Sequence, residues 1–169
     1  MSKTTRWFLA GWLVAATCDI VYATTFSYLR AGVAPARVLR YVASGALGAA
    51  ATQGGTGMAA IGLAFHYFNA LLFTIFFFAI AAKIPALIKS PIVTGVIYGI
   101  GIYAVMNYVV VPLSRIGARP TPATITWVTG LLVHMFLIGT PIVLAASRAF
   151  ANDFVITSGA RNLLLQARR

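Results

Sequence analysis

Two histidines stand inside long apolar segments of this sequence, and each completes the same Gly-Leu-x-x-His pattern. His66 lies in "GLAFHYFN" and His134 in "GLLVHMF", and Asn69 follows His66 by three residues. Asp19 and Asn107 interrupt two further apolar segments. Imidazole and carboxylate groups can bind protons, cations or metals, and a polar group within apolar surroundings needs a partner. These five residues are therefore the candidate site.

The composition is that of an integral membrane protein. Of the 169 residues 60% are hydrophobic and 9% are charged, whereas a soluble domain carries roughly 25% charged residues. The mean hydropathy is +0.90. The formal charge of +11 would suggest nucleic acid for a soluble protein, but here the basic residues lie between or beside apolar runs. We expect them to set topology and to meet anionic lipid headgroups, and we expect no nucleic-acid partner.

Four apolar runs are long enough to span the hydrocarbon core, which needs about 20 helical residues. They cover residues 7–28, 57–82, 91–113 and 123–146. The sequence thus predicts an all-α fold, a four-helix membrane bundle formed by a single domain over 1–147. Residues 148–169 are predicted to be a basic cytoplasmic tail.

A shorter segment lies between the first two spans. Over residues 35–48 Arg37 and Arg40 recur on one helix face while apolar residues hold the other, and Pro35 suits a first helical turn. This pattern predicts an amphipathic helix at the membrane interface rather than a fifth span.

Basic residues favour one orientation. If both termini are cytoplasmic, eight Lys and Arg lie inside and five outside, which follows the positive-inside rule. The inner set is Lys3, Arg6, Lys83, Lys89, Arg148, Arg161, Arg168 and Arg169, and the outer set is Arg30, Arg37, Arg40, Arg115 and Arg119. The sequence predicts a multi-pass protein with both termini inside.

The polar residues fall at similar depths in these spans. Counting 1.5 Å per residue, both histidines lie about 14 to 17 Å from the outer boundary, and Asp19 and Asn107 lie in the middle or outer half. We expect both histidines to face the bundle interior, with Asp19 close to at least one of them. The shared Gly-Leu-x-x-His pattern also suggests a duplicated helix pair, although chance agreement between apolar helices explains it equally well.

Several chemistries remain open for this cluster. An Asp19–histidine pair without water would be a structural lock, and the same groups in a wet cavity would form a proton or cation path. Ligation of haem or a metal by His66 and His134 ranks lower, and no cofactor is predicted. The two acidic residues of the chain provide no paired-carboxylate or nucleophilic constellation, so we do not expect an enzyme.

Small residues predict close helix packing at four positions: Gly62, Gly130, Gly95 and Gly99. The last two belong to "GVIYG", through which we expect the protein to form a homo-oligomer. A place as a subunit of a membrane complex is the alternative.

Five segments of the chain are "CDIVYA", "RVLRYVASGALG", "GLAFHYFNALLF", "YAVMNYVVVPLS" and "LLVHMFLIGTPIVLAASR". Together they resemble a family of small bacterial multi-pass inner-membrane proteins. The stretch "FHYFNALLFTIFFFAIAAKIPALIKS" is more distantly similar to YagU-like proteins. The resemblance implies a bacterial cytoplasmic membrane location but no substrate. The sequence as a whole predicts a non-enzymatic binding, assembly or accessory module, with proton or cation translocation as the alternative.

Overall fold

The computed structural model describes residues 1–117 and 123–151, and all regular structure in this part of the chain is helical. The α-helices are α1 (Lys3–Ala31), α2 (Pro35–Leu47), α3 (Thr56–Lys83), α4 (Pro91–Val105), α5 (Val111–Leu113) and α6 (Thr124–Val133). Two 3₁₀ helices, η1 (Ala49–Gln53) and η2 (Pro85–Ile88), lie in connections. Two π-helices, η3 (Met106–Val110) and η4 (His134–Gly139), interrupt the third and fourth long helices.

Four helices are long and apolar enough to cross a membrane: Lys3–Ala31, Thr56–Lys83, Pro91–Leu113 and Thr124–Ala151. They confirm the predicted all-α bundle with four spans. The fourth helix continues to Ala151, five residues beyond its predicted end at 146. The rest of the predicted basic tail lies outside the described residues.

The helix ends follow from local residue chemistry. The Ser2 hydroxyl accepts a hydrogen bond from the Thr5 amide at 3.1 Å and so caps the start of α1. Gly32 ends that helix in the left-handed region at φ 62°, where a residue without Cβ is favoured. Proline occupies the first position of α2 and of α4, where its missing N–H costs nothing.

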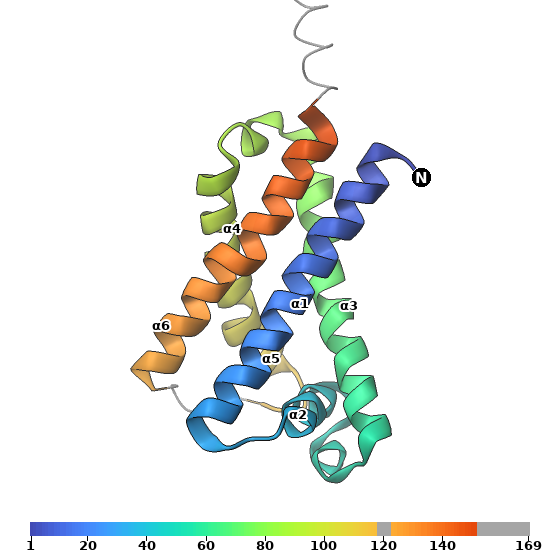
Figure 1. Cartoon of the computed structure of the whole chain (residues 1–169), viewed down its shortest axis with the longest axis vertical. Coiled ribbons are helices and arrows are strands. Elements are labelled where there is room, and N and C mark those ends of the chain that lie inside the picture. The colour runs from blue at the N-terminus through green and yellow to red at the C-terminus, as the bar shows by residue number, and fades with distance from the viewer. Residues whose placement is uncertain (118–122, 152–169) are drawn as a thin grey trace, which may run out of the picture.

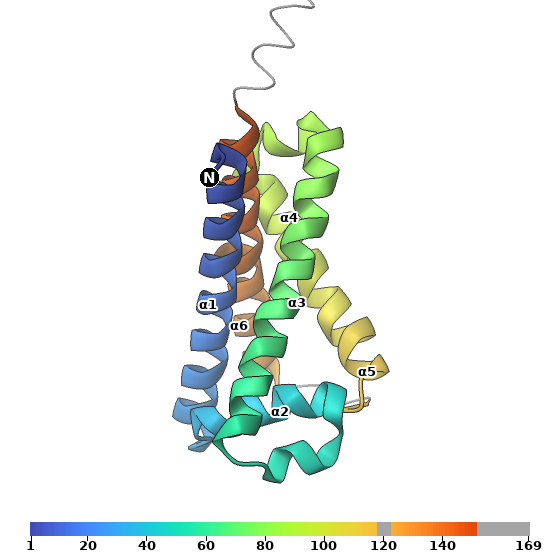
Figure 2. The same ribbon diagram turned by 90° about the vertical axis from the view of Figure 1, so that its right-hand side faces the viewer.

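The long helices run side by side, and the N-terminus and the end of the last helix lie at the same end of the bundle (Figure 1). We call this the terminal end. Helix α2 lies across the opposite end, which we call the α2 end (Figure 2). Helix α1 packs against α3 and η4, α4 packs against η4, and α2 packs against α3.

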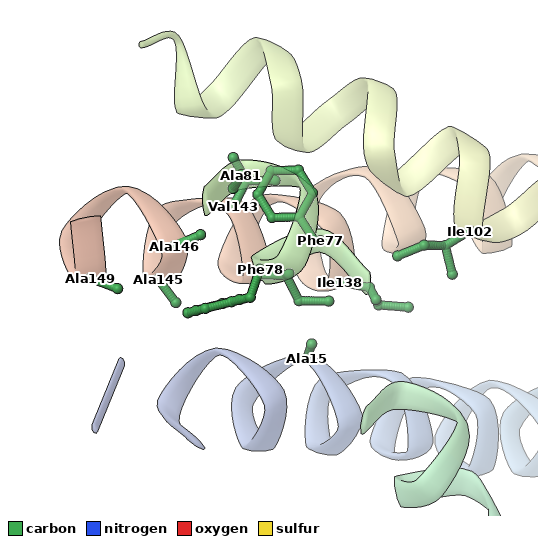
Figure 3. Packing of buried hydrophobic residues seen from close by; sticks show 11 residues of the cluster. Ala15, Phe77, Phe78, Ala81, Ile102, Ile138, Val143, Ala145, Ala146 and Ala149 are labelled. Atoms are coloured by element: carbon green, nitrogen blue, oxygen red, sulfur yellow. The ribbon is translucent and has the colours of Figure 1, made fainter. Parts of the chain in front are cut away.

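The terminal half of the bundle is a close-packed apolar core (Figure 3). This core joins Phe77 and Phe78 of α3, Ala15 of α1 and the alanines near the end of the last helix. Phe77, Ile142 and Val143 are at most 1% exposed. Tyr98 closes the α3–α4 contact, because its hydroxyl donates to the Phe73 carbonyl at 2.6 Å.

The predicted packing glycines all lie where backbones or rings approach closely. A methyl group added at Gly99 would overlap the His134 carbonyl, and one at Gly95 would lie 2.5 Å from the Thr140 Cα. One at Gly62 would overlap the Leu39 carbonyl of α2, and one at Gly130 would lie 3.2 Å from the Tyr103 ring. In "GVIYG" the two glycines are covered by the last helix of the same chain, and the oligomer expected there stays a prediction.

Replacing Gly99 by alanine is expected to destabilise the protein by about 1–3 kcal/mol, since overpacking forces the backbones apart. Gly101 on the same helix is the matched control, because nothing lies within 4 Å of a methyl group there. Gly101→Ala should be neutral or stabilising by about 0.5–1 kcal/mol. Thermal unfolding in detergent measures both, and equal transitions for the two variants would refute the α4–η4 contact.

Two hydrogen bonds join helix α2 to neighbouring segments of the chain. The Arg40 side chain donates to the Thr52 carbonyl at 3.1 Å, and the Arg115 amide donates to the Gly45 carbonyl at 2.9 Å. Arg37 is exposed, as the amphipathic pattern predicts, whereas Arg40 is half-buried. The apolar face of α2 turns Val38 and Val42 toward the bundle interior.

Candidate functional site

A cavity of about 600 Å³ lies among the four long helices. Its walls come from every long helix, and Val38 and Val42 of α2 belong to its lining. Helices α3 and α5 diverge toward the α2 end (Figure 2). In that part of the bundle the helices enclose a cavity, whereas in the terminal half they pack tightly.

The cavity collects the polar residues that the sequence singled out. Its lining includes Asp19 of α1, His66 and Asn69 of α3, Asn107 of η3 and His134 of η4. All five are half-buried. Each of the four long helices therefore contributes at least one polar group to a single space.

His66 joins α3 to α1. Its Nε2 lies 2.8 Å from the Ala16 carbonyl oxygen, and because a carbonyl only accepts, this nitrogen carries the proton. The ring also meets Tyr67 edge to face at a centroid distance of 5.7 Å. The Nδ1 atom has no hydrogen-bond partner among residues 1–117 and 123–151.

His134 is held within its own helix instead. Its Nδ1 donates to the Gly130 carbonyl at 2.8 Å, which leaves Nε2 without a partner in the described chain. The Tyr103 ring packs edge to face on the imidazole at 5.1 Å, and Gly130 leaves room for this ring. The two histidines thus leave different ring nitrogens free, Nδ1 of His66 and Nε2 of His134. The hydrogen bonds of the two rings therefore differ between the helix pairs that the sequence suggested to be duplicates.

Asn107 and His134 both stand at the start of a π-helical turn. The Asn107 amide donates to the Tyr103 carbonyl at 2.9 Å, and like His134 it bonds the carbonyl four residues earlier. A π-turn widens the helix and upsets the regular hydrogen-bond ladder, so a nearby side-chain donor can satisfy a carbonyl. Such turns are frequent at functional sites. Asn69, in contrast, has no hydrogen-bond partner in the described chain.

Asp19 has neither a hydrogen bond nor an ion pair among residues 1–117 and 123–151. No buried side-chain oxygen without a hydrogen bond occurs in this part of the chain. Because the Asp19 carboxylate has no hydrogen bond, its oxygens are therefore accessible rather than buried. Asp19 shares the cavity with both histidines, but the expected pairing with one of them is not formed. Each histidine bonds a backbone carbonyl instead.

Aromatic rings make up much of the remaining wall. Tyr22 and Phe26 follow Asp19 on one face of α1, and their rings lie 5.3 Å apart. The Tyr22 hydroxyl bonds the Thr129 hydroxyl at 2.7 Å and so ties α1 to α6. Trp127 of α6 also lines the cavity.

The sequence analysis missed the π-turns and the aromatic wall. A signal for the π-turns was present in Pro112 and Pro141, which lie late in the third and fourth spans. Proline removes an i→i−4 hydrogen bond and clashes with the preceding turn, and a widened turn relieves this clash. Tyr22 and Tyr103, which the sequence analysis did not single out, line the cavity.

A metal site receives little support from this geometry. No group of three or more His, Cys, Asp or Glu side chains in the described residues is placed to hold a metal ion. One nitrogen of each histidine is already engaged by a carbonyl. The other nitrogen of each ring stays available, as in metal-ligating histidines whose second nitrogen donates to a backbone carbonyl, but no third ligand joins them among the described residues.

The fold and the cavity define a class of protein. It is a multi-pass, all-helical membrane protein whose four-helix bundle encloses a mainly apolar cavity with a few polar side chains. Comparison with known protein families, with curated proteins and with solved structures finds no match to this chain. The resemblance to YagU-like proteins stays a prediction.

Proposed function

We propose that this protein is a non-enzymatic binding module of the bacterial cytoplasmic membrane, and that the cavity around Asp19 is its binding site. The observation that supports this is the convergence of Asp19, His66, Asn69, Asn107 and His134 from four spans on one space of about 600 Å³. Ligand cavities typically measure about 300–1,000 Å³ and combine an apolar lining with a few polar groups.

The unpartnered carboxylate favours a binding role over a structural one. An aspartate at the centre of a membrane helix costs about 2.5–3.5 kcal/mol on insertion scales. A structural lock would offset that cost with a partner, and Asp19 has none in the described chain. A group retained at such a cost without a stabilising contact is better explained by a ligand or by bound water.

We further propose that both termini are cytoplasmic and that α2 faces the outside. Arg30, Arg37, Arg40 and Arg115 belong to the α2 end, where they can meet anionic headgroups. The larger basic set then lies inside, as the positive-inside rule requires. The cavity, which reaches Val38 and Val42 of α2, would lie nearer the outer surface.

Proton or cation translocation is the second candidate. The free ring nitrogens of His66 and His134 and the Asp19 carboxylate favour it, because they are groups that can take up and release protons. The packed core around Phe77 and Val143 closes the terminal half. Translocation would therefore require a rearrangement of this core, which binding alone does not.

Thiol labelling tests the proposed site. In a chain whose one cysteine, Cys18, is replaced by alanine, Asn69→Cys should react rapidly with a membrane-impermeant methanethiosulfonate added outside intact cells. Thr74→Cys on the same helix is the matched control, because Thr74 is fully buried. We expect at least about tenfold faster labelling at 69, since thiol reactions need access to solvent.

Inverted vesicles separate the two parts of this proposal. Labelling at 69 only from the cytoplasmic side would contradict the orientation and keep the binding cavity. Equal, slow labelling of both cysteines from either side would contradict an accessible cavity.

A further inference from the structure

We propose that the ligand of this cavity is an amphipathic organic cation, meaning an ammonium or similar centre attached to an apolar body. This inference rests on the proposed binding function and specifies its ligand. Three features of the cavity support it: its charge, its aromatic wall and its size.

The charge of the cavity selects for a cation. The lining formed by the described residues contains the carboxylate of Asp19 and no Lys or Arg, although the chain has 13 of them. The carboxylate has no competing partner in the described chain. A cationic ligand would supply the missing counter-charge in a region where water screens charges poorly. An anion would meet the carboxylate without a fixed compensating cation.

The aromatic wall suits the same ligand. Tyr22 and Phe26 continue the helix face that begins at Asp19, and Trp127 and Tyr103 form an edge-to-face pair at 6.5 Å. Aromatic faces attract cations, most strongly ammonium centres that are only weakly hydrated. The Tyr22–Thr129 hydrogen bond holds the wall from α1 against α6. A carboxylate and aromatic rings therefore bound one space.

The size of the cavity favours an organic over an inorganic cation. A volume of about 600 Å³ equals the liquid volume of about twenty waters, so a bare metal ion would fill little of it. Metal ions also require several converging ligands, and the described residues contain no group of three. An organic cation instead fills the space with its apolar body and places its charge at Asp19.

Binding of tritiated tetraphenylphosphonium to the purified full-length protein tests this inference. Asp19→Asn should weaken binding at least about tenfold, because it removes the attraction between two opposite charges at contact distance inside a protein. Asp153→Asn is the matched control, because it removes the only other acidic residue of the chain and so changes the net charge equally. Its affinity should stay within about twofold of the wild type.

Two competing compounds of equal shape, one charged and one neutral, show whether binding depends on charge or on apolar contacts alone. Phenyltrimethylammonium should displace the probe, and its neutral isostere tert-butylbenzene should not. Equal binding to Asp19→Asn, equal displacement by the neutral compound, or no binding to the wild type would overturn the cationic ligand. Those results would leave the thiol-labelling test of the cavity untouched, so the ligand class and the proposed function fail separately.

Discussion

Replacing Asp19 by asparagine is expected to leave the protein as stable as the wild type, or more stable by about 1–2 kcal/mol. The reason is that the variant removes a charge that is costly in the membrane and that has no partner among the described residues. A structural lock predicts the opposite sign, since breaking a buried ion pair costs about 3–5 kcal/mol. The two accounts therefore differ by several kcal/mol.

Unfolding of the variant and the wild type in the same mixed micelles measures this difference. Asp153→Asn provides the control for the loss of one negative charge. A transition of Asp19→Asn well below both reference proteins would contradict an unpaired, ligand-binding carboxylate and favour the lock.

Replacing Gly62 by alanine is expected to destabilise the α2–α3 contact by about 1–3 kcal/mol. The added methyl group would overlap the Leu39 carbonyl and lie 3.2 Å from the Ala43 amide. Backbone atoms cannot rotate away as a side chain can, so α2 has to move as a whole. Because Val38 and Val42 line the cavity, the same displacement should weaken ligand binding.

Limited proteolysis of the segment between α2 and α3 reports this displacement, because a detached α2 exposes its flanking chain. Gly57→Ala is the matched control on the same helix, where a methyl group meets nothing within 4 Å. Cleavage at equal rates in the two variants would show that α2 is not held through Gly62.

Much of the fold was predictable because membrane spans have a simple signal. Runs of about 20 apolar residues must form helices that satisfy their own backbone groups, and the four spans end within a few residues of the predicted positions except at Ala151. The amphipathic pattern of α2 was equally clear, because Arg37 and Arg40 cannot lie in hydrocarbon.

The site was harder to predict because its details depend on which backbone atoms lie nearby. The rule that buried polar groups need partners pointed to Asp19 and the histidines together. It could not foresee that the Ala16 carbonyl binds His66 and the Gly130 carbonyl binds His134. Gly95 and Gly99 likewise signal a close helix contact, but the sequence does not say whether the other helix belongs to the same chain.

Solid-state NMR of the protein in bilayers, with ¹⁵N-labelled histidine, tests the central claim most directly, because His66 and His134 are the only histidines in the chain. For the neutral rings the account predicts two tautomers, with the proton on Nε2 of His66 and on Nδ1 of His134. Both rings should receive magnetisation from water much faster than the core residues Phe77 and Val143, which are at most 1% exposed and do not line the cavity. Histidine rings that receive it as slowly as that core would contradict a water-accessible binding cavity.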